Sequence, residues 1–429
     1  MATELHVRVV QDPSRGFTAL PDRLTRGPDI TVTLDSLGED RIRARLYGPA
    51  VPSLHGTEHC VDLSVRPADV RAASARLCRQ WKEHFVDHQP DDEPENAYAT
   101  LVDLRSRPVA EVHGIVSELA LVGSELLHGT LLGSADERVV RFRGYLTEAL
   151  GSREGLRVRF DSDLHVPWPM VCLQRNQVPY DPKDDGTLSW LFRRFLGHRH
   201  QIEQTGGHYP WVGGLREAPD VPAVSLNHDT RLDRRGRTRA ADVAAVLAKG
   251  TRFVERTTRG ELVDALDQED LCEQVMYFWC HGHYVPNGAQ PASLALRLTD
   301  RKTIDAQTVR DRRREYGSDS PFQPFVVLNA CHAGVPEGGD HKFLSVALIE
   351  AGARGVLGPQ IEMPQMFAAE YALEFLSRYL HGTGTAGDIA HAVARHFADV
   401  LRNPLGFAYT LHSGMDTRLE RAAGQESAG

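Results

Sequence analysis

Apolar and polar residues alternate along the first part of the chain in the way that is typical of half-buried β-strands. Three such runs occupy residues 30–34, 41–46 and 61–65, and a segment rich in Ala, Arg and Leu then begins at Pro67. Alternation with a period of two predicts strands, and proline in the first turn predicts the start of a helix. Residues 109–132 are predicted to form further helices. We therefore expect residues 1–135 to form a smaller mixed α+β region, for which a regulatory role is our hypothesis.

After about residue 135, helical segments alternate with short strands that are apolar throughout. The runs 275–280 and 325–328 are the clearest, and similar strands are predicted at 156–160, 221–226, 251–255 and 354–357. Strands that are apolar on both faces are typical of a parallel sheet with helices on each side. The sequence therefore predicts an α/β fold over residues 150–415, with a mostly parallel sheet and a ligand site beyond the carboxyl ends of its strands.

Composition and charge are ordinary for a soluble globular protein. Of 429 residues, 41% are apolar and 25% charged, and the net charge of −9 argues against non-specific binding to nucleic acids or anionic membranes. No signal peptide and no apolar run of membrane-spanning length is visible, so we expect a cytoplasmic protein with no membrane or direct nucleic-acid partner. The six cysteines include no C-x-x-C pair, which favours free thiols, and no cofactor is predicted.

Two basic runs lie at residues 231–239 and 310–314. We interpret both as solvated loop or helix faces rather than nucleic-acid sites. The first run is also a candidate cleavage or activation site, because exposed loops are the preferred places of proteolysis.

The two most apolar strands each end in a reactive side chain. His281 and Gly282 follow the first, and Cys331 follows the second. A helical stretch between them predicts a crossover, which makes the two strands parallel and either neighbours or one strand apart. Their ends then lie roughly 5–10 Å apart. A thiol beside an imidazole is an activated nucleophile, so the sequence predicts a catalytic Cys–His dyad, whereas Cys280 is expected on the opposite face of the sheet.

Several segments resemble the CHAT domain family, the bacterial relatives of caspases and separase, over about residues 150–415. The 50 residues between His281 and Cys331 match the histidine-to-cysteine separation of about 50 in caspases. Pro169 and His332 stand at positions where the family commonly has Glu. The matching segments are Leu164–Trp168, Cys280-His281-Gly282, Leu328-Asn329-Ala330-Cys331, Ala351–Val356 and Asn403–Ala408.

The resemblance implies peptide-bond hydrolysis through an acyl-enzyme, with the backbone N–H groups of Gly282 and Cys331 as the oxyanion hole. It also implies a protein substrate, for example a gasdermin-like or other effector of prokaryotic defence, and an activator that the sequence does not identify.

Substrate preference depends on the residues at the ends of neighbouring strands. Asp161 and Asp163 follow the strand at 156–160, and Glu362 follows the strand near 354. Carboxylates at the pocket for the residue before the cleaved bond would favour Arg or Lys there. The alternative interpretation is that these acids are solvated loop residues.

Two other interpretations use the same residues. His281, His283 and Cys331, with His332, could bind zinc, which prefers nitrogen and sulfur ligands, although no H-E-x-x-H helix supplies a general base. A catalytically inactive scaffold or adaptor with this fold is the second alternative.

Overall fold

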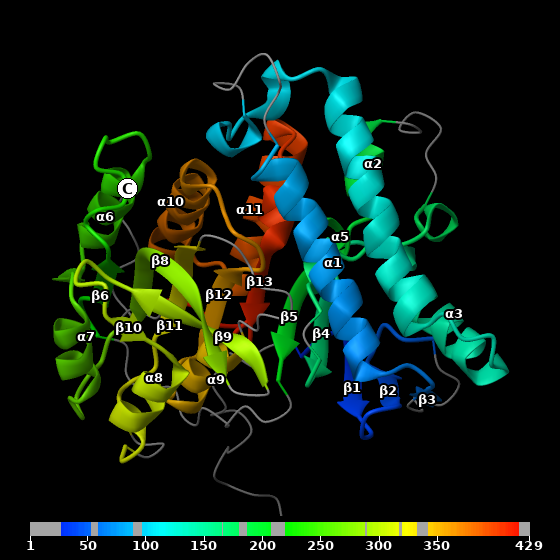
Figure 1. The fold of residues 1–429 in the computed structure, drawn as a ribbon, viewed down its shortest axis with the longest axis horizontal. Coiled ribbons are helices and arrows are strands. Elements are labelled where there is room, and N and C mark those ends of the chain that lie inside the picture. Colours follow the sequence, from blue (N-terminus) through cyan, green and yellow to red (C-terminus); the bar gives the residue numbers. More distant parts are fainter. Residues whose placement is uncertain are drawn as a thin grey trace, which may run out of the picture.

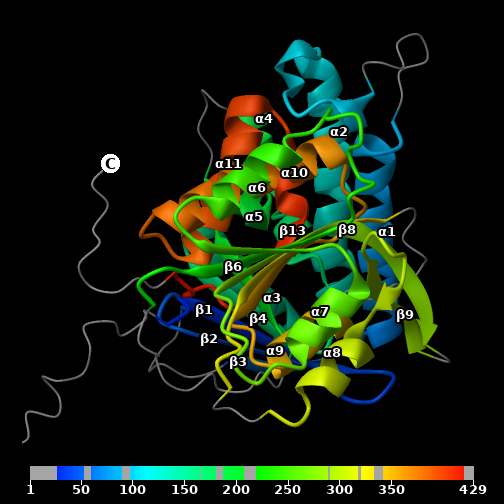
Figure 2. The same cartoon turned by 90° about the vertical axis from the view of Figure 1, so that its left-hand side faces the viewer.

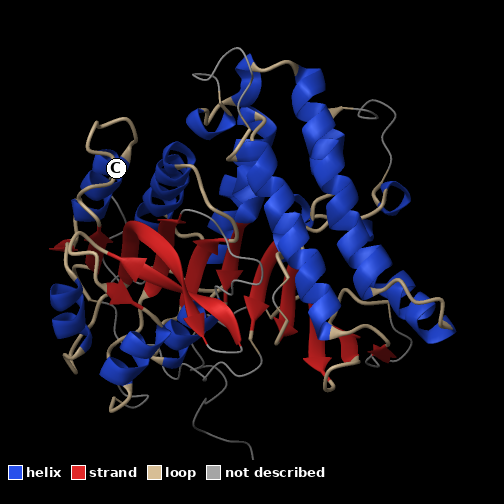
Figure 3. Ribbon diagram, in the orientation of Figure 1, coloured by secondary structure: helices blue, strands red, loops and turns tan. Residues whose placement is uncertain are grey.

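One large mixed sheet crosses the molecule, and helices cover both of its faces (Figures 1 and 3). The computed structural model describes residues 27–52, 59–88, 97–164, 166–179, 187–206, 219–287, 290–316, 320–332 and 342–419. No helix in these ranges is long and apolar enough to cross a membrane.

The described residues contribute thirteen strands to this sheet. Its main order is β10-β9-β8-β11-β12-β13-β5-β4-β1-β2-β3, and β6 pairs with both β7 and β8. The strands are β1 (Ile30–Ser36), β2 (Ile42–Tyr47), β3 (His59–Leu63), β4 (Arg157–Ser162), β5 (Gln201–Thr205), β6 (Ala223–His228), β7 (Arg252–Arg256), β8 (Val275–Asn287), β9 (Gln290–Arg297), β10 (Thr303–Ile304), β11 (Phe325–His332), β12 (Gly355–Pro359) and β13 (Tyr409–His412).

Strand direction reverses once in the middle of the sheet. Strands β6, β7, β8, β11 and β12 run parallel to one another, and β13 then pairs antiparallel with β12. Strands β5, β4 and β1 run parallel to β13. The prediction of an α/β fold with a mostly parallel sheet is confirmed, but the sheet contains two parallel blocks of opposite direction.

Helices lie in two layers, one on each face of the sheet, and Figures 1 and 2 show this arrangement from two sides. One layer contains α7 (Arg259–Leu266), α8 (Ala306–Arg313) and α9 (Lys342–Glu350). The other contains α1 (Pro67–Phe85), α2 (Val109–Glu125), α3 (Glu137–Ser152), α4 (Leu188–Phe192), α5 (Leu196–Arg199), α6 (Ala240–Ala248), α10 (Gln365–His381) and α11 (Ala386–Leu401). Short turns of 3-10 or π-helix are η2 (Tyr98–Thr100), η3 (Leu104–Ser106), η4 (Leu126–Leu131), η5 (Trp168–Met170), η6 (Arg175–Gln177) and η7 (Pro404–Ala408).

Local sequence signals explain where several helices begin. Pro67 occupies the first turn of α1, where its missing N–H costs nothing. Thr258 and Glu261 form a reciprocal capping box at the start of α7, and Thr385 and Asp388 form another at α11. Each box satisfies two backbone N–H groups that have no partner within the helix.

Alternate residues of β8 enter two different apolar clusters. Met276, Phe278 and Cys280 belong to the cluster beneath α7–α9, whereas Tyr277 and Trp279 belong to the cluster beneath the other layer. This alternation confirms the prediction that Cys280 lies on the opposite face from His281.

The N-terminal strands extend the same sheet rather than forming a separate one. β1 pairs in parallel with β4, and one apolar cluster runs from Val32 and Trp81 to Phe397. The helix α3 spans the predicted boundary between residues 135 and 150. The two predicted regions therefore share a sheet and a core.

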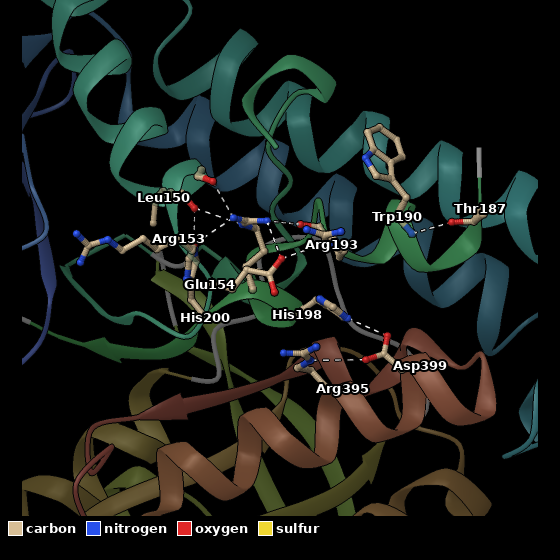
Figure 4. A network of polar contacts seen from close by, with 12 residues as sticks. Leu150, Arg153, Glu154, Thr187, Trp190, Arg193, His198, His200, Arg395 and Asp399 are labelled. Carbon is tan, nitrogen blue, oxygen red and sulfur yellow. Dashed lines mark hydrogen bonds and ion pairs between the residues drawn. The ribbon is translucent and has the colours of Figure 1, made fainter. Parts of the chain in front are cut away.

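A polar network fastens the end of α3 to α5 and α11 (Figure 4). The guanidinium of Arg199 is buried and donates to the carbonyl oxygens of Leu150, Gly151 and Arg153. Its neighbour His198 places Nε2 2.9 Å from Asp399 Oδ1 on α11. Buried charge is tolerated here because hydrogen bonds surround it.

Candidate active site

Strands β8 and β11 are parallel neighbours, and their register places His281 directly opposite Cys331. The pairing runs without a shift from Val275 and Phe325 to Gly282 and His332. The side chains of Cys331 and His332 lie outside what the structure describes, so the position of residue 331 follows from the backbone. Residues in register on adjacent strands are separated by about 4.8 Å. The predicted parallel arrangement of these two strands is confirmed.

A satisfied polar network beneath this point fixes β11. The Asn329 side chain is buried, and its Nδ2 donates to Tyr277 Oη at 3.2 Å and to the Ala368 carbonyl at 2.8 Å. Its Oδ1 accepts from Tyr409 Oη at 2.7 Å. Residues two apart on a strand share a face, so position 331 lies on the same face as Asn329. These contacts tie β11 to β8, α10 and β13.

Asp229 is a candidate site residue that the sequence analysis did not single out. It follows β6 directly, and its fully buried carboxylate places Oδ2 3.7 Å from Nε2 of His281. Arg231 Nε donates to Oδ1 at 2.8 Å, and Arg231 Nη2 donates to Oδ2 at 2.6 Å. Its position after a predicted strand, at the edge that also carries His281, was the available signal.

The electrostatics of this group favour the ionised form. Burial raises the pKa of Asp229, but hydrogen bonds from Arg231 and the charges of Arg231 and His281 outweigh burial and hold that pKa below its usual range. An ionised carboxylate therefore faces the His281 imidazole, whose side chain is 46% exposed.

A cleft of about 640 Å³ has His281 in its wall. The loop at residues 231–238 supplies most of the lining. Ala99 and Thr100 of η2 and Gln365 and Met366 of α10 supply the rest. The N-terminal region therefore contributes directly to the surroundings of the candidate catalytic histidine.

Gly282 lies within β8, in register with His332 on β11 and with Leu296 on β9. Its backbone is thus next to residue 331. The oxyanion role of Gly282 and Cys331 stays a prediction.

The three predicted specificity acids are not brought together. Asp161 and Asp163 belong to the end of β4, which runs opposite to β8 and is five strand spacings, roughly 24 Å, away. They lie at the opposite edge of the sheet, so they cannot line a pocket beside His281. The expectation failed because β12 and β13 are antiparallel. Glu362 does lie at the correct edge, but its Oε2 is 3.6 Å from Nζ of Lys82 on α1.

His283 is partly enclosed, and its Nε2 lies 3.5 Å from Thr303 Oγ1. Burial, followed by the charge of Arg297, lowers the pKa of His283. Among the described side chains, which leave out Cys331 and His332, no group of three or more His, Cys, Asp or Glu residues is arranged to hold a metal ion.

Comparisons with known proteins found one matching family model and several similar solved structures. Residues 224–407 match the family model of the CHAT domain. Two crystal structures of the Saccharomyces cerevisiae separase–securin complex are similar, with TM-scores of 0.46 and 0.42 and sequence identities of 10% and 8%. Each alignment covers 90% of this chain and 30% of the matched chain, so the chain spans about a third of its length. None of the curated proteins matches.

The matched region extends from β6 through η7 and contains Asp229, His281 and Cys331. Residues 224–407, which make up less than half of the chain, therefore resemble a CHAT domain.

Proposed function

We propose that this protein is a cysteine endopeptidase in which Cys331 is the nucleophile and His281 the general base and acid. The observation that carries the proposal is the unshifted parallel register of β8 and β11, which sets residues 281 and 331 side by side at the carboxyl edge of the sheet. The position of this pair inside the CHAT match supports the same reading.

The chemistry then follows the usual course of thiol-dependent acyl transfer. His281 accepts the proton of the Cys331 thiol, and the thiolate attacks the carbonyl carbon of the scissile peptide bond. The imidazolium next gives its proton to the leaving amine, and a water molecule deprotonated by His281 hydrolyses the acyl-enzyme. The N–H groups of Gly282 and Cys331 would hold the oxyanion.

Asp229 acts in this scheme through His281. Its ionised carboxylate, 3.7 Å from Nε2, orients the ring and stabilises the imidazolium that forms during the reaction. It is a positioning residue, because it touches the histidine rather than the substrate.

The substrate is a protein, and a gasdermin-like or other defence effector is the candidate that the family resemblance suggests. Incubating the wild-type chain and Cys331→Ala with proteins encoded next to its gene tests this narrower point. A cut product with the wild type alone would identify the substrate.

An electrophilic peptide, such as a peptidyl chloromethyl ketone, tests the proposed nucleophile. Mass spectrometry should find the label on Cys331 of the wild type, and Cys331→Ala should be unlabelled and cleave no peptide. Cys60→Ala is the matched control, because Cys60 is an exposed thiol on β3, outside the candidate site. It should behave as the wild type does. His281→Ala should reduce cleavage by about 100-fold or more.

Three outcomes would contradict the proposal. Cleavage by Cys331→Ala at the wild-type rate would show that Cys331 is not the nucleophile. A wild-type chain that neither reacts with the electrophilic peptide nor cleaves any peptide would indicate a catalytically inactive scaffold. One zinc per chain, lost in both His283→Ala and Cys331→Ala, would indicate a metal site instead.

A further inference from the structure

The cleft beside His281 is lined by four arginines from a single loop. These are Arg231, Arg234, Arg235 and Arg237. The Arg231 side chain is hydrogen-bonded to Asp229. The other three arginines are exposed. Within the described part of the chain, the guanidinium groups of these three have no ion pair or hydrogen bond. Three unpaired cations around one cleft stand out in a chain whose net charge is −9.

Among the described residues, Asp233 is the acidic residue that lines this cleft, and it does not neutralise them. Asp233 has a left-handed backbone with φ of 53°. Its carboxylate accepts hydrogen bonds from the Arg237 N–H at 2.6 Å and from the Thr238 N–H and hydroxyl at 3.0 and 2.6 Å. The carboxylate therefore holds the loop in shape, and the guanidinium groups remain available to a ligand.

Another part of the cleft wall has the same electrostatic sign. Gln365 and Met366 belong to the first turn of α10, which spans 17 residues and has no side-chain cap at its N-terminus. The N-terminal end of a helix carries a partial positive charge. This partial positive charge adds to the full charges of the arginines.

We propose that this arginine cleft, defined by Arg234, Arg235 and Arg237 together with the rest of the loop, binds Asp or Glu side chains of the protein substrate. The enzyme would then cleave polypeptides beside acidic residues. Guanidinium groups match carboxylates in charge and in bidentate geometry, and a cleft of about 640 Å³ is large enough for several peptide side chains. This inference rests on the proposed peptidase function and specifies its substrate class.

The proposal reverses the preference for Arg or Lys that Asp161 and Asp163 suggested from the sequence. Those carboxylates lie at the far edge of the sheet, whereas the arginines share a cleft with His281.

Matched peptides test the assignment. One set contains Asp or Glu around the scissile bond, and the other contains Asn or Gln at the same positions. For the wild type we expect kcat/KM to be about tenfold or more higher on the acidic set, and added salt to shrink this ratio because exposed charges are screened. The ratio should approach one in the triple variant Arg234→Gln, Arg235→Gln and Arg237→Gln.

A second triple variant controls for the change in net charge. Arg41, Arg138 and Arg314 are exposed and lie outside the cleft, so their change to Gln should keep the wild-type ratio. Circular dichroism and thermal unfolding should show that both triple variants are folded. If the wild type cleaves both peptide sets equally well, the cleft assignment is overturned and the peptidase proposal still holds.

If no peptide is cleaved, a measurement of peptide binding tests the arginine cleft separately from the peptidase proposal. Fluorescence anisotropy of a labelled acidic peptide should show binding to Cys331→Ala, and the same chain with the three cleft changes should bind at least about tenfold more weakly. Equal binding would overturn the assignment. Tighter, arginine-dependent binding of a single-stranded oligonucleotide would also overturn it, in favour of a nucleic-acid site.

Discussion

At the scale of single residues, the buried carboxylate of Asp229 is the least expected part of the site. Arg231 neutralises it from one side, while the other side faces His281 at 3.7 Å. Burial without a partner would push such a carboxylate towards its neutral form, and the Arg231 contacts prevent this. The pair thus keeps a negative charge against the imidazole in a place that water does not reach.

Asp229→Asn should lower kcat for peptide cleavage by roughly 10- to 1000-fold and leave KM within about twofold, because a neutral amide neither orients nor stabilises the imidazolium. Steady-state kinetics on one acidic peptide measure both constants. Asp242→Asn is the control, since Asp242 is an exposed acid on α6 that pairs with Arg239. If Asp229→Asn lowers the melting temperature but leaves kcat unchanged, the residue supports only the fold.

At the scale of elements, the sequence predicted many of the strands but not their order across the sheet. The apolar runs at 275–280 and 325–328 form β8 and β11, and their parallel pairing follows from the crossover between them. Strands β5 and β13 were not predicted, and these two strands carry the reversal of direction. Pairing between distant strands depends on tertiary packing rather than on local pattern, so the edge reached by Asp161 could not be predicted.

Prediction of the candidate site was limited in the same way, by the unknown pairing of strands that are distant in sequence. The adjacency of residues 281 and 331 could be predicted because strand ends in a parallel block meet at one edge, whereas Asp229 needed the knowledge that β6 borders β8. The exposure of the arginine loop was predicted correctly, but the cleft that it shares with His281 is also lined by η2 and α10, which are distant in sequence.

Two glycines of α2 allow an element-scale test of packing. A Cβ at Gly123 would lie 2.6 Å from the carbonyl oxygen of Met170, whereas a Cβ at Gly114 would meet nothing within 4 Å. Gly123→Ala should therefore destabilise the protein by about 1–3 kcal/mol, because α2 must move away from η5. Gly114→Ala should stabilise it by up to about 1 kcal/mol through helix propensity.

Urea unfolding of the two variants and the wild type measures these free energies. The comparison isolates packing, because both changes are identical and lie on one helix. Equal effects of the two substitutions would show that α2 does not rely on close contact with η5.

At the scale of the whole molecule, the N-terminal region is part of the structure around the site. Ala99 and Thr100 line the arginine cleft, and Asn403 Nδ2 near the end of the CHAT match donates to the Val102 carbonyl at 3.0 Å. The regulatory role of residues 1–135 stays a prediction. Any signal that moves η2 would nevertheless alter the cleft directly, because Ala99 and Thr100 are part of its wall.

One buried and one partly buried histidine join these parts through hydrogen bonds of their neutral rings. His200 Nε2 donates to the Leu150 carbonyl at the end of α3, and His391 Nε2 on α11 donates to the His198 carbonyl, both at 2.8 Å. Burial lowers the pKa of His200 to about 3 and that of His391 to about 4. Both rings are therefore neutral in the folded protein at any pH near neutrality.

The linkage between protonation and folding gives a definite sign. In the unfolded chain these histidines gain protons below about pH 6.5, while in the folded chain they do not until about pH 4 or 3. The unfolded state thus binds more protons in that window, and stability falls as the pH falls through it. Acidification from pH 7.5 to pH 5 should therefore lower the free energy of unfolding by about 2 kcal/mol for each histidine.

Urea unfolding at pH 7.5 and pH 5 tests this prediction with His200→Gln, whose amide N–H can replace the Nε2 donor but does not titrate. The loss of stability on acidification should be about 2 kcal/mol smaller in this variant than in the wild type. His381→Gln, at the exposed end of α10, should show the wild-type loss. Acidic groups titrate equally in all three chains. An identical loss of stability in all three would therefore mean that His200 is protonated in the folded state. It would disprove the neutral hydrogen bond from His200 to the end of α3.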